Sequence, residues 1–195
     1  MNPQAAQSRG SHAGVTMVEL IITMTIAGIL LTMGVSGYRY VTRSNRASGE
    51  INALLGDMQF ARYEAVKEGE PVRICPAASA SATTCSTTTS WSGGWMVLSN
   101  ALSGSSGTAN VLRRQLPFSS FSSTDTLTTT VTSVDFDREG YAMGLAGTGG
   151  LNGTVVFSLH DSTSTTSYTR CLMLGVSGVM QTGMASATIL GKTCS

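Results

Sequence analysis

The stretch HAGVTMVELIITM, residues 12–24, opens an apolar run that carries a single charged residue, Glu19. The 21 residues from Val15 to Val35 contain no other charge. As a helix rising about 1.5 Å per residue, this run would be roughly 32 Å long and would cross the hydrocarbon core of a bilayer. A carboxylate inside such a segment costs about 2.5 to 3.5 kcal/mol to insert, so Glu19 needs a specific role.

The rest of the 195-residue chain fits one folded domain attached to this segment. Charged residues make up 12% of the chain and its formal net charge is +1, which argues against a strongly electrostatic partner such as bulk nucleic acid. No charged side chain occurs from Ile74 to Leu112, where Ser, Thr, Gly and Asn dominate. The solubility of this part must therefore rest on hydroxyl groups.

The chain has an even number of cysteines, all outside the apolar run: Cys75, Cys85, Cys171 and Cys194. They lack the paired CxxC spacing of a zinc site, and only two histidines could assist them. Two disulfides in an oxidising compartment are favoured over buried free thiols. Of the three possible connectivities we expect Cys75–Cys85 and Cys171–Cys194, because each closes a short loop within one half of the chain.

The topology signals around the apolar run disagree. The run is too long for the apolar region of an ordinary signal peptide, and no AxA-like cleavage site follows it. Arg39, Arg43 and Arg46 follow the run, and the positive-inside rule would place them in the cytoplasm. The cysteines place the same side outside the cytoplasm. We give the cysteines more weight, since the charge bias is statistical.

After the apolar run, helical spacing predicts that the helix continues to about Glu68. Gly69 suits a C-cap, and Pro71 disfavours helical backbone at the preceding residue. Arg62 falls within the expected apolar stripe, where its stem can pack while its guanidinium reaches sheet carbonyls or a carboxylate. The expected stripe consists of Ile51, Leu54, Leu55, Met58, Ala61, Ala65 and Val66, with Glu50, Asp57, Glu64 and Glu68 outside it.

Beyond Pro71 the sequence predicts short strands separated by Ser/Thr/Gly loops. No further long helical periodicity occurs, so the sheet is expected to be antiparallel, with its apolar face covered by the helix stripe. This arrangement is an α+β fold. The expected strands are 72–75, 95–98, 111–116, 127–136, 154–159, 169–174 and one near 187–190.

The junction at Gly14 resembles the prepilin peptidase site of type IV pilins and type II secretion pseudopilins. The sequence there reads G-VTMVEL, from Gly14 to Leu20. In that family cleavage falls after the glycine, the new N-terminal residue is methylated, and the fifth mature residue is a glutamate. The resemblance therefore implies cleavage after Gly14, methylation of Val15, and the family's assembly role for Glu19. Val15 departs mildly from the family, where phenylalanine is commoner at this position.

Further segments are similar to the FimT/FimU/GspH branch of this family. They are ARYEAVKEGEPVRIC (61–75), WSGGWMVL (91–98), VDFDREGYA (134–142) and RCLMLGVSGVMQ (170–181). The resemblance implies a type IV pilin-like fold, with one long N-terminal helix packed on an antiparallel β-sheet. It also implies a leader at 1–14, a transmembrane half-helix at 15–35, an amphipathic half-helix at 36–69 and a periplasmic β-rich domain at 70–195.

The family resemblance implies a minor pilin that takes part in type IV pilus assembly, in the tip or priming complex. Its partners would be other pilins, prepilin peptidase and, before assembly, the inner membrane, with the C-terminal domain in the periplasm. Glu19 would balance the terminal amine of an adjacent subunit, since two buried charges that pair cost less than either alone. The alternative for Glu19 is an intrahelical role beside the positive end of the helix dipole.

Two other functions within the family stay open. A pseudopilin of a type II secretion system would have the same fold, and no residue separates the two roles. Some family members bind DNA through a C-terminal Gly-Arg-x-Arg motif, but the matching place here reads Gly178, Val179, Met180, Gln181. Arg113 and Arg114 are adjacent in an expected strand and should point to opposite faces. We therefore expect no strong binding of nucleic acid.

The sequence gives little support to catalysis, and we expect neither an enzyme nor a cofactor. His160–Asp161 lies beside serines, but the tract DSTSTTS fits a polar turn better than a catalytic triad. Three acidic residues, Asp135, Asp137 and Glu139, do not have the spacing of an EF-hand and are expected to be solvated turn charges. Trp91 and Trp95 are expected to pack in the core and its loops.

Overall fold

The computed structural model describes residues 14–79, 81–99, 110–117, 125–143, 153–162 and 164–194. The chain divides into two units, Met1–Val41 and Thr42–Ser195. Helix α1 (Met17–Glu68) belongs to both and ends next to Gly69, whose φ of 69° fits the expected C-cap. Apart from Gly14, the expected leader lies outside the described residues.

In the first unit, every described side chain of α1 is exposed. Among the described residues α1 is the one helix that is long and apolar enough to cross a membrane, and its most apolar window has no buried residue. Its threonines place their hydroxyls on carbonyls of the preceding turn, at 2.9 Å for Thr23 to Leu20 and 2.7 Å for Thr32 to Ile29. The hydroxyls of these threonines are thus satisfied within the helix, as an apolar environment requires.

In the second unit, α1 buries one narrow stripe whose members are spaced alternately four and three residues apart, each at most 3% exposed: Ala47, Ile51, Leu54, Met58, Ala61 and Ala65. One expectation about this face is wrong. Val66 is 53% exposed, since it lies about 100° around the helix from Ala65. Glu50 and Asp57, each 8% exposed, are buried at the flank of the stripe, where cations pair with them.

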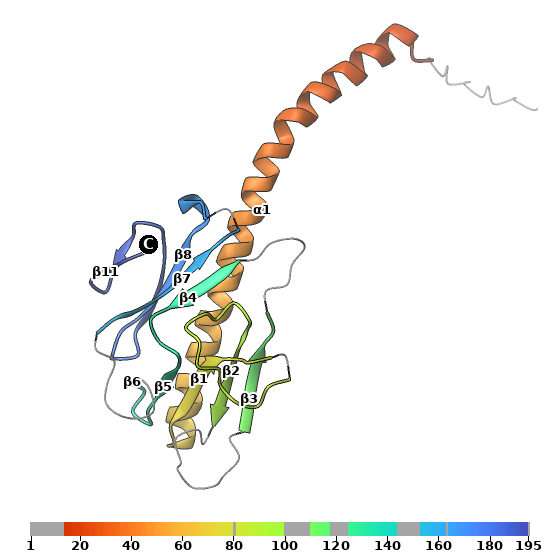
Figure 1. The fold of residues 1–195 in the computed structure, drawn as a ribbon. Coiled ribbons are helices and arrows are strands. Elements are labelled where there is room, and N and C mark those ends of the chain that lie inside the picture. Colours follow the sequence, from red (N-terminus) through yellow and green to blue (C-terminus); the bar gives the residue numbers. More distant parts are fainter. Residues whose placement is uncertain are drawn as a thin grey trace, which may run out of the picture. The chain divides into compact units, whose positions relative to one another are not determined.

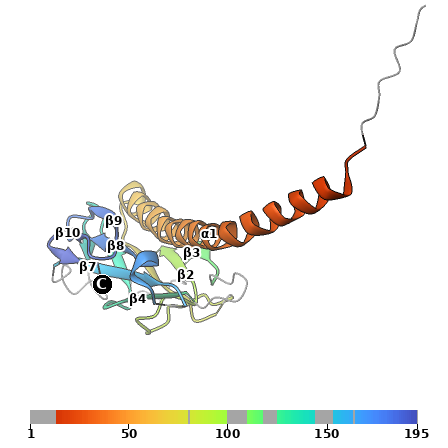
Figure 2. The ribbon, with the colours of Figure 1, turned by 90° about the horizontal axis from the view of Figure 1, so that it is seen from above.

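Two antiparallel sheets pack beside this part of α1 (Figures 1 and 2). The five-stranded sheet has the order β3-β2-β1-β5-β6, and the four-stranded sheet has the order β4-β7-β8-β9. The first sheet is formed by β1 (Val72–Pro76), β2 (Trp95–Ser99), β3 (Asn110–Gln115), β5 (Val134–Phe136) and β6 (Ala142–Met143). The second is formed by β4 (Thr126–Thr129), β7 (Val155–His160), β8 (Arg170–Leu174) and β9 (Met180–Met184), and a separate hairpin by β10 (Thr188–Ile189) and β11 (Lys192–Thr193).

The α+β fold with one long helix on antiparallel sheets is confirmed, but the expected single sheet is two. The strand expected at 127–136 is divided into β4 and β5, which belong to different sheets. No Gly or Pro interrupts its sequence, so the change of sheet leaves no signal in the residue pattern. Strands β6, β9 and β11 were not expected, because each is short or largely polar.

A single hydrophobic core joins the helix stripe to the inner faces of both sheets. Trp91 and Trp95 are fully buried in it, which confirms their expected packing role. Trp91 meets the ring of Phe157 edge-on, with ring centroids 5.1 Å apart. The indole of Trp95 donates a hydrogen bond of 2.8 Å to Asp57 on the helix. These aromatic residues connect loop, strand and helix within one core.

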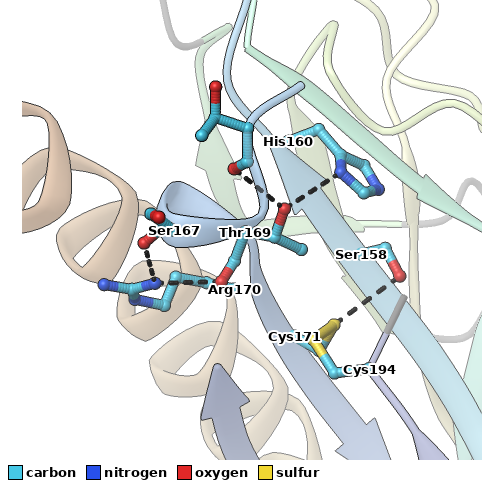
Figure 3. The surroundings of a disulfide bond; sticks show 8 residues. Ser158, His160, Ser167, Thr169, Arg170, Cys171 and Cys194 are labelled. Carbon is cyan, nitrogen blue, oxygen red and sulfur yellow. Dashed lines mark hydrogen bonds between the residues drawn. A yellow bond between two sulfur atoms is a disulfide. The ribbon is translucent and has the colours of Figure 1, made fainter. Parts of the chain in front are cut away.

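Two disulfides hold small covers over the outer faces of the sheets. Cys75 of β1 is joined to Cys85, and Cys171 of β8 is joined to Cys194 near the chain end, with the hydroxyl of Ser158 beside Cys171 (Figure 3). The structure thus contains the two pairs expected from the sequence. A second apolar cluster lies under the first disulfide loop and a third under the β10–β11 segment, which explains why β8 is buried on both faces.

Arg62 links the helix to turns of both sheets. Its guanidinium donates to the carbonyl of Gly140 at 2.9 Å, in the β5–β6 hairpin, and to that of Gly178 at 3.2 Å, in the β8–β9 turn. A third contact reaches the carbonyl of Ser177 at 3.4 Å. The expectation that Arg62 packs its stem and reaches sheet carbonyls is confirmed. Both glycines have a positive φ, 83° and 73°, and a side chain at either would press on the guanidinium.

We predict that Gly178→Ala destabilises the domain by about 3 kcal/mol, from backbone strain and steric overlap together. The left-handed backbone alone costs an alanine about 1 to 2 kcal/mol, and the added Cβ would overlap the carbonyl oxygen of Gly140 and the Arg62 guanidinium. Gly191→Ala is the matched control, since its φ of 75° is similar but nothing lies within 4 Å of the new Cβ. Urea unfolding of a fragment beginning at Thr42 measures both, and equal losses would contradict the proposed overlap.

Candidate functional site

The expected processing site lies at the start of α1. Gly14, Val15 and Thr16 precede the helix and are exposed. Nothing lies within 4 Å of a Cβ built on Gly14, and its φ is outside the left-handed region. Neither packing nor backbone conformation therefore requires glycine at this position.

Glu19 occupies the first turn of α1, where its backbone N–H donates to the Thr16 hydroxyl at 3.2 Å. Thr16 thus acts as an N-cap three residues before an acidic side chain, which is half of a capping box. The Glu19 carboxylate is exposed, and it makes no hydrogen bond or ion pair with any residue that the structure describes. In the first turn, the carboxylate is stabilised by the positive end of the helix dipole. Its oxygens remain open to a partner.

Two of the arginines that follow the apolar run pair with carboxylates of the second unit. Arg46 makes a bidentate contact with Asp125, at 2.8 and 2.7 Å, and Arg43 lies 3.9 Å from Asp161 and over the ring of Tyr168. Both acceptors are buried, so these pairs fasten the β-rich part to the helix. The two arginines thus have a structural explanation that is independent of membrane topology.

Glu50 adds a second carboxyl group to the Arg46–Asp125 pair. Burial is the main reason that the pKa of Glu50 is raised from 4.5 to about 7; the charge of Asp125 and a hydrogen bond with it act in the same direction, against the weaker effect of Arg46. Its Oε2 is buried with no hydrogen-bond partner among the described residues. The sequence contained one signal of this cluster, the i,i+4 spacing of Arg46 and Glu50.

The cations of the first sheet are also paired. Arg73 contacts Asp135 through two hydrogen bonds of 2.6 and 2.9 Å, and Asp135 is fully buried. The expectation that Asp135 is a solvated turn charge is therefore wrong, because it lies within β5 opposite a cation of β1. Arg113 lies 3.0 Å from Asp57 and 4.8 Å from the centre of the Phe60 ring. Arg114 donates instead to the carbonyl of Ala82, which confirms that the two adjacent arginines face opposite ways.

The histidine and aspartate once weighed as triad residues have structural contacts. The Nδ1 of His160 lies 3.3 Å from the Thr169 hydroxyl (Figure 3). Asp161 accepts the backbone N–H of Thr165 at 3.3 Å. Among the residues that the structure describes, no group of three or more His, Cys, Asp or Glu side chains could hold a metal ion. These contacts fit a polar turn.

Comparison with known proteins agrees with the fold and the N-terminal geometry. Residues 50–178 match the family described as "Type II transport protein GspH", and residues 9–35 match the prokaryotic N-terminal methylation motif. The chain belongs to the GspH family of minor pilins and pseudopilins. The methylation motif spans the apolar start of this chain, including Gly14, Val15 and Glu19.

Two crystal forms of the type IV minor pilin FimU of Pseudomonas aeruginosa strain PAO1 have a similar fold. One is 19% identical with a TM-score of 0.52 and covers 78% of this chain and 95% of FimU. The other is 21% identical with a TM-score of 0.49 and covers 70% and 90%. No relative among functionally curated sequences matches this chain significantly. Members of the pilin and pseudopilin family are structural proteins.

In this chain, the place of the family's DNA-contacting arginines lies in the β8–β9 turn and the start of β9. Gly178 forms the turn, Val179 is 42% exposed, and Gln181 is exposed on the strand. Arg170, which could have contributed to a basic surface here, is only 6% exposed and donates to Ser44, Ser48 and two carbonyls. Several arginines of this domain are thus occupied by intramolecular contacts.

We predict that this protein loses stability as the pH rises because of Glu50. Its folded-state pKa exceeds the unfolded value, so the proton stabilises the fold below about pH 4.5 and this stabilisation is lost as the pH passes about 7. The loss should be about 1 to 2 kcal/mol, since one pKa unit is worth about 1.4 kcal/mol and solvent screens part of the effect.

Glu50→Gln tests this prediction, because the amide stays neutral at every pH. The variant should be more stable than the wild type at about pH 8 and similar to it at about pH 4.5. Glu70→Gln, at an exposed position, is the control and should follow the wild-type profile. Parallel profiles for wild type and Glu50→Gln, measured by urea unfolding across the pH range, would contradict the role of Glu50.

Proposed function

We propose that this protein is a minor pilin that takes part in type IV pilus assembly, in the tip or priming complex. The observation that carries the proposal is the match to the N-terminal methylation motif at the start of α1. The glycine of this motif, Gly14, is not required there by packing or by backbone conformation. The exposed apolar surface of α1 supports a segment built to be covered by lipid or by other helices. The similar fold of FimU, itself a type IV minor pilin, supports the pilus role.

In this proposal prepilin peptidase removes residues 1–14 and Val15 becomes the methylated N-terminus. Residues 15–35 then hold the protein in the inner membrane, while the amphipathic half-helix at 36–69 and the β-rich domain at 70–195 lie in the periplasm. Two disulfides support this orientation, because such bonds persist in an oxidising compartment. The intramolecular pairs of Arg43 and Arg46 weaken the opposing charge argument.

A role as a minor pseudopilin in type II secretion is the second candidate. The family match, described as a type II transport protein, favours it specifically. Deletion of the gene separates the two functions, because loss of surface pili with normal protein export supports the pilus role. Normal pili with failed export of secreted proteins would favour the secretion role instead.

We predict that the mature chain begins at N-methylated Val15. N-terminal sequencing and intact mass of the membrane-extracted protein measure this directly. Gly14→Val should keep the leader attached and leave the fold unchanged, because the new side chain meets nothing within 4 Å of its Cβ. A chain that retains Met1, or one that is cleaved after residue 30, would reject the proposed processing.

We predict that Glu19→Ala allows membrane insertion but strongly reduces pilus formation. Removal of the carboxylate lowers the insertion cost by about 2.5 to 3.5 kcal/mol, but leaves the terminal amine of a neighbouring subunit without its partner. Thr16→Ala is the matched control: it removes the cap of the Glu19 N–H, worth about 1 kcal/mol, and keeps the carboxylate. Sheared-pilus yield is the measurement, and normal piliation in Glu19→Ala would exclude the pairing role.

We predict weak binding of duplex DNA by a fragment beginning at Thr42. Phosphate contacts from Lys and Arg supply most nonspecific affinity, while Arg62, Arg73, Arg113 and Arg170 are held by intramolecular contacts. The salt dependence should be shallow, and Val179→Arg combined with Gln181→Arg should steepen it. Submicromolar binding by the unaltered fragment at about 150 mM salt would contradict this prediction.

A further inference from the structure

Arg170 is a buried cation that lacks a carboxylate partner. Its side chain leaves β8 on the face opposite Cys171 and extends to α1 (Figure 3). The guanidinium donates to the hydroxyls of Ser44 at 2.9 Å and Ser48 at 3.3 Å, and to the carbonyls of Ser167 and Thr169 at 3.1 and 2.9 Å. All four acceptors are neutral oxygens.

No acidic side chain of this protein compensates the charge of Arg170. All eleven Asp and Glu residues lie in the described ranges, and none has an oxygen within 4.0 Å of an Arg170 nitrogen. By contrast, Arg43, Arg46, Arg73 and Arg113 each contact an aspartate. Arg62 and Arg114 also donate to carbonyls, but among the described cations Arg170 alone is buried. Because an uncompensated buried charge is costly, Arg170 is the candidate for an external anion.

A pocket of about 180 Å³ lies at Arg170, between α1 and β9. Its walls are formed by Ser48, Ile51, Asn52, Arg170, Thr182, Gly183 and Met184. Asn52 and Met184 are exposed, so the pocket is open at these residues. The volume equals roughly six water molecules at about 30 Å³ each, which suits one short side chain with its carboxylate and a few waters.

The polar lining of this pocket favours an anion of single charge. The Ser48 hydroxyl accepts the Nε–H of Arg170, so its own hydrogen is available to donate. The Asn52 amide and the Thr182 hydroxyl are further donors on the two walls. One guanidinium with neutral donors balances one carboxylate, whereas a phosphate dianion would retain excess charge. Ile51 and Met184 provide an apolar surface for the methylene stem of the ligand.

We propose that the Arg170 pocket receives an acidic side chain from a neighbouring pilin subunit. This assignment of the occupant rests on the proposed function, in which other pilins surround α1. The pocket wall on α1 lies 13 residues beyond the end of the apolar run at Val35, so a membrane-anchored neighbour can reach it. A carboxylate seated there would pair with Arg170 and connect the neighbour to both α1 and the second sheet.

Acetate serves as the probe of the pocket in the full mature chain, purified in detergent micelles. The Arg170 Nε–H resonance should shift saturably with sodium acetate and not with sodium chloride at equal ionic strength. At about ten times its dissociation constant, acetate should raise Tm by about 3 to 5 °C. Both responses should disappear in Asn52→Trp, which fills the pocket mouth. They should persist in Gln59→Trp, which adds the same bulk at another exposed position of α1.

The occupant is identified by a photo-crosslinking amino acid at position 52, in cells that assemble pili. We expect a crosslink to an Asp- or Glu-containing peptide of another pilin. Arg170→Lys should reduce this crosslink at least fivefold, because an ammonium has three donors and cannot make the four contacts of the guanidinium within the chain and also donate to a ligand. The same crosslinker at position 59 is the control. Absence of any acetate-specific response would overturn the anion site.

The two arms also separate this inference from the proposed function. An acetate response without a pilin crosslink, in cells with normal pili, would assign the pocket to a free small carboxylate and overturn the subunit contact. An acetate response in a protein whose deletion affects neither pili nor secretion would reject the proposed function and, with it, a pilin occupant. A variant of the buried Arg170 could fail to fold. Asn52→Trp changes an exposed side chain instead, so the acetate test does not depend on the folding of an Arg170 variant.

Discussion

The narrow stripe on α1, from Ala47 to Ala65, is the feature on which the globular unit depends. Two separate sheets bury their inner faces against it, and the residues of all three elements form one core. Its spacing of alternately four and three residues keeps the contact on a single line along the helix. Alanines at both ends of the stripe permit close approach of the strands, while Leu54 and Met58 fill the centre. Neither sheet has another partner of comparable size among the described residues.

The outer faces of the sheets raise a different problem, because a strand buried on both sides needs a second layer. Each sheet has a short disulfide-linked segment for this purpose, the loop at Cys85 and the hairpin that ends near Cys194. A disulfide stabilises such a cover mainly by restricting the unfolded chain. Charge density in this chain is low. Disulfides and a few ion pairs therefore supply stability that bigger domains obtain from larger buried apolar layers.

The elements that repeat a simple residue pattern could be predicted from the sequence. Features that depend on contacts between residues far apart in the chain could not. The helix, its C-cap, the α+β class and most strands follow from periodicity and from Gly and Pro. The burial of Asp135 depends on Arg73, 62 positions away, and the Arg46–Asp125 contact spans 79 positions. No local pattern distinguishes a carboxylate that will meet such a partner from one that faces solvent. The division between β4 and β5 was missed for the same reason, because it is set by packing against two sheets.

Of the candidate site, the sequence located Gly14, Val15 and Glu19 through the family's motif, whereas the pocket at Arg170 required three-dimensional contacts. Leader removal, in our proposal, places an ammonium group at the positive end of the α1 dipole, where it is electrostatically unfavourable. Thr16 already caps the Glu19 N–H, so the carboxylate is not needed to complete that contact. In an apolar bundle, a free ammonium and a free carboxylate would each carry a desolvation cost that pairing reduces.

The same reasoning applies to Arg170, whose buried charge is met only by neutral oxygens within the chain. In our two proposals, Glu19 and Arg170 are therefore charges whose most favourable partner is on another subunit, and a subunit that satisfied both internally would lose two of its reasons to assemble.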